Sequence, residues 1–451
     1  MKFINKISTP LLFILAVVQT NVNAKVTPEE AAKLGKELTL IGAEKAGNQA
    51  GTIPAYTGGL TADRNVDYRV NIFADEQPLF TITAKNVDQY QDNLSPGQIA
   101  LLKQYPDTYF MPVYKTHRTA SQPQQVLHKA KVNALNTVLL DDGNGLGNFD
   151  ETIPFAIPKS GLEVIWNHIT RYRGGNVARN FSMIPVQRNG SFTPVKLVTE
   201  FSSPQYISDG YDENKDDNIL FYYTSKITSP ARLSGTLLLI HETIDQIKAP
   251  RKAWTYNPGQ RRVRRAPNVA YDAPNNGSDG LRTTDQVDMF AGSPMRYNWK
   301  IVGKKELYIP YNSYALANPD LEYDDMVQAN HVDQTLTRYE LHRVWQIEAS
   351  IKDKTRNIYS KRVFYIDEDS WQISIADLYD DKNLLWRVSE AHQLQYAVGN
   401  TNFVSAEIYH DLMAERYLAI LSNEIKEPIV FEQQSSRKDF SLGALRRSGK
   451  R

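Results

Sequence analysis

The chain contains no cysteine. Disulfide bonds, thiolate metal sites and thiol nucleophiles are therefore excluded. A bacterial lipoprotein carries its lipid on a cysteine just after the signal peptide, so lipid modification of that kind is excluded as well. The stability of the fold must come from burial of apolar side chains.

The chain also lacks an excess of charge of either sign. Its 52 lysines and arginines stand against 51 aspartates and glutamates, which gives a formal net charge of +1. Such a balance creates no overall field that attracts a polyanion, so we predict no nucleic-acid partner.

Sequence signatures of catalysis are missing too. His241 and Glu242 begin an HExxH zinc motif, but Asp245 stands where the second histidine belongs. No GxSxG nucleophile turn is present. We therefore predict that the protein is not an enzyme and needs no cofactor. A glycan hydrolase stays open as an alternative, because its two carboxylates can lie far apart in sequence.

Two acidic segments resemble calcium-binding loops only at their start. The segment from Asp142 has Leu146 at a ligand position, and the segment from Asp212 has Tyr223 where the bidentate glutamate belongs. The number of oxygen ligands falls short in both. We interpret them as solvated acidic turns and predict no metal site, with weak calcium binding as the alternative.

The N-terminal apolar run is short. It covers residues 11–18, well below the roughly 20 residues that span a bilayer. Lys2 and Lys6 precede it, and the small residue Ala24 follows a polar stretch. This order is typical of a secretory signal peptide. We predict cleavage after Ala24 and export to the periplasm.

Two short helices are predicted in the first third of the mature chain. Thr27 and Glu30 form a capping box with Pro28 at the first helical position, and apolar residues follow at helical spacing until about Gly47. The second helix begins after Ser95.

Beyond these helices the first part of the mature chain is irregular and glycine-rich. We therefore predict a signal peptide (1–24), an N-terminal wrapping region (25–159), and a main unit with a C-terminal extension (160–451). Residues 25–451 are expected to form one compact unit.

A clearer helix follows Ser160. Ser160 and Glu163 are spaced as a capping box, and Gly174 and Gly175 are expected to stop the helix. Its apolar stripe must cover another part of the protein. The stripe consists of Leu162, Ile165, Trp166 and Ile169.

From about residue 176 to residue 397 the apolar period changes to two, which indicates strands. Residues 251–267 predict a hairpin whose turn contains Pro258 and Gly259, with a positive φ at the glycine. Later strands are joined by short acidic turns, which forces antiparallel neighbours and predicts a meander. The segment 403–424 fits a helix or a hairpin equally well.

Several long segments resemble one bacterial family. They are VTPEEAAKLGKELTLIGAEKAGN, GTIPAYTGG, RKAWTYNPGQRRVRRAPNVAYD, TTDQVDMFAGSPMRYNWKIVGKKELYIPYN and RVFYIDEDSWQISIADLYDDKNLLWRVSEAH. The family is domain of unknown function 1329 (DUF1329), which is similar to periplasmic lipoprotein carriers of the LolA and LolB type. The resemblance covers essentially the whole mature chain.

This resemblance implies a mainly β, α+β fold: a half-open antiparallel β-barrel whose apolar concave face is covered by helices. It also implies the envelope of a Gram-negative bacterium. Partners implied in the same way are efflux-type (RND-type) envelope transporters and outer-membrane barrel proteins. No particular activity is implied.

The predicted hairpin offers candidate ligand-binding residues. Trp254 and Tyr256 are candidates for contact with an apolar ligand, and Arg262 and Arg264 for an anionic head group. The alternative is a solvated hairpin whose arginines lie over aromatic neighbours. Strands place alternate residues on opposite faces, so the arginines of this run cannot all meet one ligand.

A second candidate is the segment 283–300, which is expected to close the barrel mouth. In the alternative interpretation it is structural, and Asp285 and Asp288 satisfy buried arginines or backbone amides. Its candidate ligand-binding residues are Met289, Phe290, Tyr297 and Trp299.

A third candidate is an apolar stripe around Leu341 and Trp345, which alternates with polar residues. The stripe either lines a lipid cavity or forms packed core, and the sequence leaves both possibilities open.

We therefore predict a periplasmic carrier or accessory protein that shelters a hydrophobic molecule, such as a lipid or a lipid-modified chain. The first alternative is a module without a ligand that docks to an envelope transporter or an outer-membrane barrel; it requires a filled interior and an exposed strand edge or apolar patch. The second alternative is the glycan hydrolase.

Overall fold

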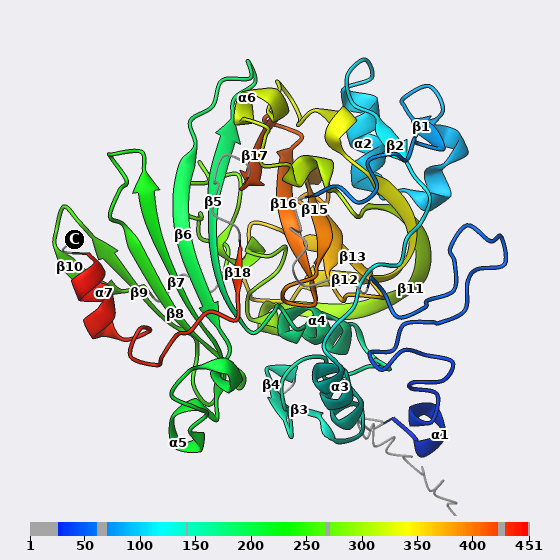
Figure 1. Cartoon of the computed structure of the whole chain (residues 1–451). Helices are drawn as coiled ribbons and strands as arrows, with labels where there is room; N and C mark the ends of the chain where they lie inside the picture. The colour runs from blue at the N-terminus through cyan, green and yellow to red at the C-terminus, as the bar shows by residue number, and fades with distance from the viewer. Residues whose placement is uncertain (1–25, 61–69, 141–142, 267–270, 423–428, 450–451) are drawn as a thin grey trace, which may run out of the picture.

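One large, mainly antiparallel sheet dominates the fold (Figure 1). A computed structural model describes residues 26–60, 70–140, 143–266, 271–422 and 429–449, so the predicted signal peptide lies outside the described residues. The strands are β1 (Phe80–Ile82), β2 (Met111–Val113), β5 (Asn176–Val186), β6 (Val195–Ser202), β7 (Ile219–Ser229), β8 (Leu237–Thr243), β9 (Lys252–Asn257), β10 (Arg262–Arg265), β11 (Tyr297–Pro310), β12 (Tyr339–Ile351), β13 (Lys361–Asp367), β14 (Ile373–Tyr379), β15 (Leu385–Tyr396), β16 (Thr401–Asp411), β17 (Arg416–Leu421) and β18 (Val430–Phe431).

The strand order shows that this sheet is open. It runs β1-β2-β12-β13-β14-β15-β16-β17-β5-β6-β7-β8-β9-β10, with β11 paired to β12 and β18 paired to β5. Within the described residues, β1 and β10 do not pair with each other. The predicted half-open, mainly β fold is therefore confirmed.

Helices are few and short. They are α1 (Pro28–Ala31), α2 (Pro96–Gln104), α3 (Gln124–Asn136), α4 (Gly161–Thr170), α5 (Glu213–Asp216), α6 (Tyr323–Met326) and α7 (Leu442–Ser448), and a small separate sheet pairs β3 (Val138–Leu140) with β4 (Gly145–Gly147). Among the described residues, no helix has both the length and the apolar character needed to cross a membrane.

The predicted hairpins and meander are present. Strands β12 to β15 are antiparallel neighbours in sequence order, and residues 403–424 contain the hairpin of β16 and β17. The β9–β10 hairpin is also confirmed. The expected positive φ at Gly259 is wrong, because Arg261 takes it instead (φ 50°) and donates its backbone N–H to the Asn257 carbonyl at 2.9 Å.

The first predicted helix is much shorter than expected. The capping box of Thr27 and Glu30 forms, but α1 ends at Ala31 after one turn. Gly35 and Gly42 then take positive φ values of 86° and 93°, which an α-helix does not contain. Tertiary contacts hold the segment in place: the Trp371 indole N–H donates to the Ile41 carbonyl at 2.9 Å.

Helix α4 begins as predicted but ends early. The Ser160 hydroxyl accepts from the Glu163 backbone N–H at 3.2 Å, whereas the Glu163 carboxylate accepts from the backbone of Lys159 instead of closing a capping box with Ser160. The helix ends at Thr170, four residues before Gly174.

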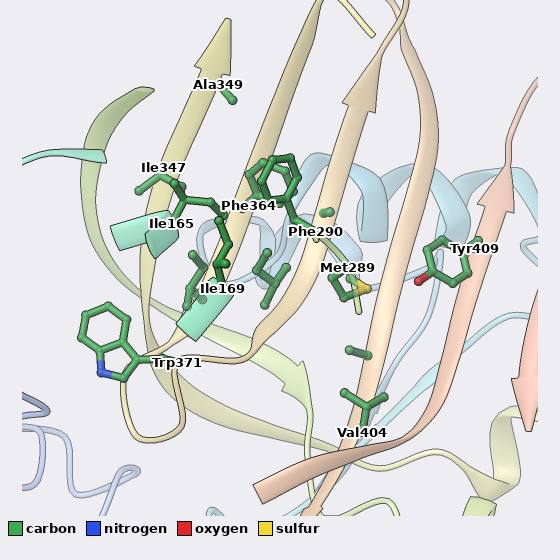
Figure 2. Close-up of a cluster of buried hydrophobic side chains, with 14 of the residues drawn as sticks. Ile165, Ile169, Met289, Phe290, Ile347, Ala349, Phe364, Trp371, Val404 and Tyr409 are labelled. Atoms are coloured by element: carbon green, nitrogen blue, oxygen red, sulfur yellow. The ribbon is translucent and has the colours of Figure 1, made fainter. Parts of the chain in front are cut away.

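The largest apolar core joins α4 to the concave face of the sheet. Figure 2 shows Ile165 and Ile169 of α4 near Phe364, with Phe290 from a long loop beside them. The rings of Phe290 and Phe364 lie 5.7 Å apart at their centroids. Burial of this kind stabilises the fold by about 25 cal/mol per Å² of apolar surface.

The N-terminal part of the chain lies on the β12–β15 part of the sheet. Helix α2 contacts β14 and β15. Arg118 reaches the turn after β13, where its guanidinium donates to both carboxylate oxygens of Asp369 at 2.8 and 2.7 Å. The backbone N–H of His117 donates to Glu340 at 2.7 Å.

Candidate functional site

A cavity of about 510 Å³ lies on the concave face of β5 to β8. Its volume is within the range of roughly 300–1,000 Å³ that is usual for small-ligand pockets. Its walls are mainly apolar. Apolar lining residues from neighbouring strands are Phe181, Met183, Leu197, Ile227, Ile240 and Ile420.

Strand alternation explains why these residues face the cavity. Every second residue of a strand points to the same face, and the cross-strand pairs keep that face in register: Phe181 pairs with Leu197, and Leu197 with Ile227. On β6 and β7 the small polar pair Thr199 and Ser225 also lines the cavity. These small side chains leave space between the larger apolar groups.

The cavity continues directly into the apolar core. Ile169 at the end of α4 and Val404 of β16 belong to the core cluster and also line the cavity. Figure 2 shows both residues within the apolar cluster. The interior of the half-barrel is therefore packed in one part and hollow in another.

The loop that contains Asp288 forms one wall of the cavity. Arg171 and Arg173 pair with the Asp288 carboxylate at 2.5 and 2.8 Å. Burial alone would raise the pKa of Asp288, but the two guanidinium groups lower it well below its usual range. Asp288 and Met289 take positive φ values of 54° and 66°, and non-glycine residues persist in that region only when the surroundings hold them. The loop is therefore firmly clamped.

The residues that line the cavity carry an excess of positive charge. They include five arginines and three carboxylates, without lysine or histidine. Three arginines are paired: Arg173 with Asp288, Arg251 with Glu242, and Arg282 with Glu407 at 3.2 Å. Arg265 is exposed at the rim. The fifth is Arg179 of β5.

The hairpin residues predicted to bind a ligand lie away from this cavity. Tyr256 is buried in a cluster on the other face of β8 and β9 with Phe440 and Leu445, and Trp254 packs against the same cluster. Helix α7 supplies Leu445 and lies beside β8 and β10 (Figure 1).

The two hairpin arginines that we predicted as head-group ligands, Arg262 and Arg264, are exposed on the edge strand β10. No ion pair is found for either of them among the described residues.

The other predicted residues lie mainly in packed regions. Met289 and Phe290 are buried in the core cluster (Figure 2). Tyr297 is buried in the same cluster, and Trp299 packs against it. Asp285 pairs with buried Arg362 at 2.6 Å, as the structural interpretation of this segment expected.

Leu341 is buried, and Trp345 stacks on Trp371 with ring centroids 6.2 Å apart. None of the ten residues predicted to bind a ligand is among those that line the cavity. A ligand role for them stays a prediction.

The residues of the incomplete zinc and calcium motifs contact other groups in the structure. His241 and Glu242 point to opposite faces of β8: the ring of His241 contacts the Phe440 carbonyl at 2.8 Å, whereas Glu242 lines the cavity. Asp216, in the second calcium-like segment, pairs with Arg437 at 2.6 Å. Asp142, which begins the first such segment, lies outside the described residues.

One polar cluster was missed in the sequence. His342, Asp367 and Asp369 have ligand atoms within 4.8 Å of one another, and all three are buried. Both oxygens of Asp369 already accept from Arg118, so the cluster is occupied by an internal cation. Burial and the neighbouring Asp369 raise the pKa of Asp367 to about 7. The acidic turn after β13 was the signal in the sequence, but its partner Arg118 lies about 250 residues earlier.

A family model and a relative from Pseudomonas aeruginosa both match most of this chain. The model of the family described as "Protein of unknown function (DUF1329)" matches residues 81–446. The chain is 53% identical over 442 residues to the uncharacterized protein PA3922 of Pseudomonas aeruginosa, and the match covers 97% of both chains.

Two solved structures are also similar to this chain. One is a DUF1329 family protein from Desulfovibrio piger, with a TM-score of 0.44 and 16% identity over 63% of this chain and 97% of that chain. The other is the LolA superfamily protein NE2245 from Nitrosomonas europaea, with a TM-score of 0.38 and 11% identity over 64% of this chain and 100% of that chain.

Proposed function

Because this chain belongs to the DUF1329 family, whose name specifies no activity, we propose a function from the geometry of the cavity: the protein is a carrier or accessory protein that holds a hydrophobic ligand in its half-open sheet. The single observation that supports the proposal is the apolar cavity of about 510 Å³ on the concave face of β5 to β8. A lipid or a lipid-modified molecule is the class of ligand proposed.

The physical reason is the cost of moving an acyl chain through water. Each exposed methylene costs about 0.8 kcal/mol, so a long chain needs a shelter to cross an aqueous compartment. The predicted signal peptide supports the periplasm as that compartment. An envelope transporter or an outer-membrane barrel protein is the proposed partner that delivers or receives the ligand.

The proposal is tested by filling the cavity. Ser225 lines it from β7, and Ser225→Trp is expected to occupy its volume and to weaken ligand binding at least tenfold. Val198→Trp is the matched control, because Val198 lies on β6 with 44% of its surface exposed and does not line the cavity. The readouts are native mass spectrometry and lipid extraction of the protein purified from periplasm, followed by titration of the stripped protein with a fluorescent fatty acid.

Loss of the ligand in Ser225→Trp and its retention in Val198→Trp would support the carrier. Equal binding by both variants, or a wild-type protein that neither carries nor takes up a lipid, would refute it. Trp254→Glu tests the hairpin prediction in the same assay, since Trp254 lies on the opposite face of the sheet from the cavity.

A docking module without a ligand is the second candidate. The observation that favours it is the edge strand β10, which among the described residues pairs only with β9 and carries the exposed residues Arg262, Arg264 and Arg265. Edge strands can add a strand from a partner, although charged side chains on an edge also serve to prevent such pairing. This module predicts that Ser225→Trp leaves function in the cell intact, whereas charge reversal at Arg262 and Arg264 abolishes it.

A glycan hydrolase would have to use carboxylates of the same cavity. Glu407 and Asp288 are the contrasting pair: burial raises the pKa of Glu407, while Arg171 and Arg173 lower that of Asp288. Opposed shifts of this kind are typical of acid and base partners. Against a catalytic role, both carboxylates are already engaged by arginines. Hydrolysis of a glycan that is lost in Glu407→Gln would overturn the carrier proposal.

A further inference from the structure

Arg179 is the partly buried arginine of the cavity that forms no ion pair among the described residues. Arg179 lies on β5, is half-buried and lines the cavity. Among the described residues it has no carboxylate within ion-pair distance, unlike Arg173, Arg251 and Arg282 in the same walls. Its one side-chain hydrogen bond is long: a terminal nitrogen donates to the Ser405 carbonyl at 3.4 Å.

The surroundings hold this cation in a fixed place while leaving donors free. The guanidinium carbon of Arg179 lies 5.1 Å from the ring centroid of Phe181 and 5.5 Å from that of Phe403, so two aromatic faces contribute cation–π attraction. The Nε atom is buried without a hydrogen-bond partner. A buried donor without an acceptor is destabilising, so an acceptor supplied by a ligand would remove that cost.

Two other polar side chains of the cavity also offer hydrogen-bond donors. Arg282 is paired with Glu407, yet its own Nε atom is also buried without a partner. Tyr223 lines the cavity too, and burial raises the pKa of its phenol, so the hydroxyl keeps its proton and can donate it in a hydrogen bond. The apolar wall of Phe181, Leu197 and Ile227 adjoins these groups.

We propose that the cavity takes an anionic amphiphile, with its acyl chain against the apolar wall and its carboxylate or phosphate head group bound by Arg179. This inference rests on the carrier function proposed above and adds the charge of the ligand to it. A guanidinium can present two parallel N–H groups to a carboxylate or phosphate, which explains why an arginine suits either head group. An uncharged lipid would leave the Arg179 donors unpaired.

The test compares three ligands that share one chain and differ only in the head group: hexadecanoate, hexadecyl phosphate and hexadecanol. Each is titrated into stripped, full-length mature protein by displacement of a fluorescent acyl probe. The wild-type protein is expected to bind at least one anionic ligand about tenfold or more tightly than hexadecanol, as hydrogen bonds to a charged group imply. The tighter of the two anions identifies the head group.

Variants test whether Arg179 causes the preference for an anionic ligand. Arg179→Met is expected to weaken binding of the preferred anion roughly tenfold and to leave hexadecanol binding unchanged. Arg179→Lys keeps the charge and is expected to keep most of the preference. Arg232→Met removes an exposed arginine that does not line the cavity, and it is expected to leave the binding of all three ligands unchanged.

The outcomes separate this inference from the carrier proposal. Equal binding of all three ligands by the wild-type protein, or equal weakening of hexadecanol and the anion by Arg179→Met, would refute the anionic ligand while the carrier stands. Binding of none of the three would refute both. If Arg179→Met fails to fold, the preference of the wild-type protein still decides the matter.

Discussion

Strand β15 buries ten of its twelve residues, whereas β7 buries two of its eleven, although both belong to one antiparallel sheet. The β12–β15 part has covered faces on both sides: α2 and the first segments of the chain lie on one, and α4 with the Asp288 loop on the other. The β5–β8 part has a cavity on its concave face. Antiparallel strand pairing is therefore compatible with a packed interior in the β12–β15 part and with a cavity in the β5–β8 part.

Arginine side chains have different partners in the two parts of the sheet. In the packed part Arg118 donates to both oxygens of Asp369 and to the Glu44 carbonyl at 2.7 Å. In the hollow part Arg179 has no carboxylate partner among the described residues. A paired arginine fixes the N-terminal segment on the sheet, whereas an unpaired one in a cavity remains available to a ligand.

The largest expected effect comes from removing the paired arginine. Arg118→Met leaves Asp369 and Glu368 buried with one cation fewer, and loss of one partner of a buried ion pair costs about 3–5 kcal/mol. Arg179→Met is the matched change in the hollow part and is expected to cost less than about 1 kcal/mol. Unfolding by urea measures both, and equal losses would mean that the two arginines do not differ in structural role.

Truncating a phenylalanine in each part sharpens the same contrast. Phe364 is fully buried in the core, and Phe364→Ala is expected to cost about 3–5 kcal/mol because it leaves a cavity. Phe201 is half-buried beside an existing cavity, so Phe201→Ala is expected to cost about 1 kcal/mol. Urea midpoints at a common temperature give the comparison, and a Phe201→Ala loss as large as that of Phe364→Ala would argue against a hollow interior.

The stability of the packed part is also expected to depend on pH. Burial raises the pKa of Asp377 to about 7 and that of Glu390 to about 7. In the unfolded chain such groups ionise near pH 4. Their contribution to stability is therefore fully present below about pH 4 and is lost as the pH rises to about 7, by about 1.4 kcal/mol per pKa unit.

Three buried histidines have the opposite effect on the pH dependence of stability. Burial lowers the pKa values of His168, His392 and His410 to about 3. The unfolded chain takes up their protons near pH 6.5, so their contribution is present above that pH and is lost as the pH falls toward 3.

Asp377→Asn separates the two effects, because it removes only a carboxyl. Its stability relative to wild type is expected to improve between pH 4.5 and pH 8, on the order of 1–3 kcal/mol, as measured by urea unfolding at several pH values. Val198→Thr, an exposed change, serves as the control and is expected to show no such trend. Parallel pH profiles for Asp377→Asn and wild type would contradict the raised pKa.

Local structure followed closely from the sequence where local signals decide it. The Thr27 capping box, the cap of Ser160, the β9–β10 hairpin and the β12–β15 meander all depend on residues within a few positions of one another. The long helix predicted after Thr27 does not form, because contacts with distant residues override its local pattern. Its apolar spacing is helical, but tertiary contacts such as that between Trp371 and Ile41 fix an irregular path.

The candidate site could not be found in the same way. Many of its residues come from β5, β6, β7 and β8, where alternation looks the same for a packed face and for a hollow one. The weak signal was Tyr223 and Ser225 on the inward face of β7, since a small polar residue there leaves space. The aromatic residues that we predicted as ligand contacts lie elsewhere. Trp254 packs against α7, and Phe290 lies in the core.

By itself the sequence determined that the chain has no disulfide or thiol chemistry, that its charges balance, and that alternating strands joined by short turns form an antiparallel sheet. Only the tertiary structure decided which part of the sheet is filled and which arginine stays unpaired. The physical reason is that the volume on a concave face and the partner of a buried charge depend on segments that are distant in the chain. Arg118 and Asp369, 251 residues apart, form an ion pair in the packed part, whereas no carboxylate of the described chain lies within ion-pair distance of Arg179.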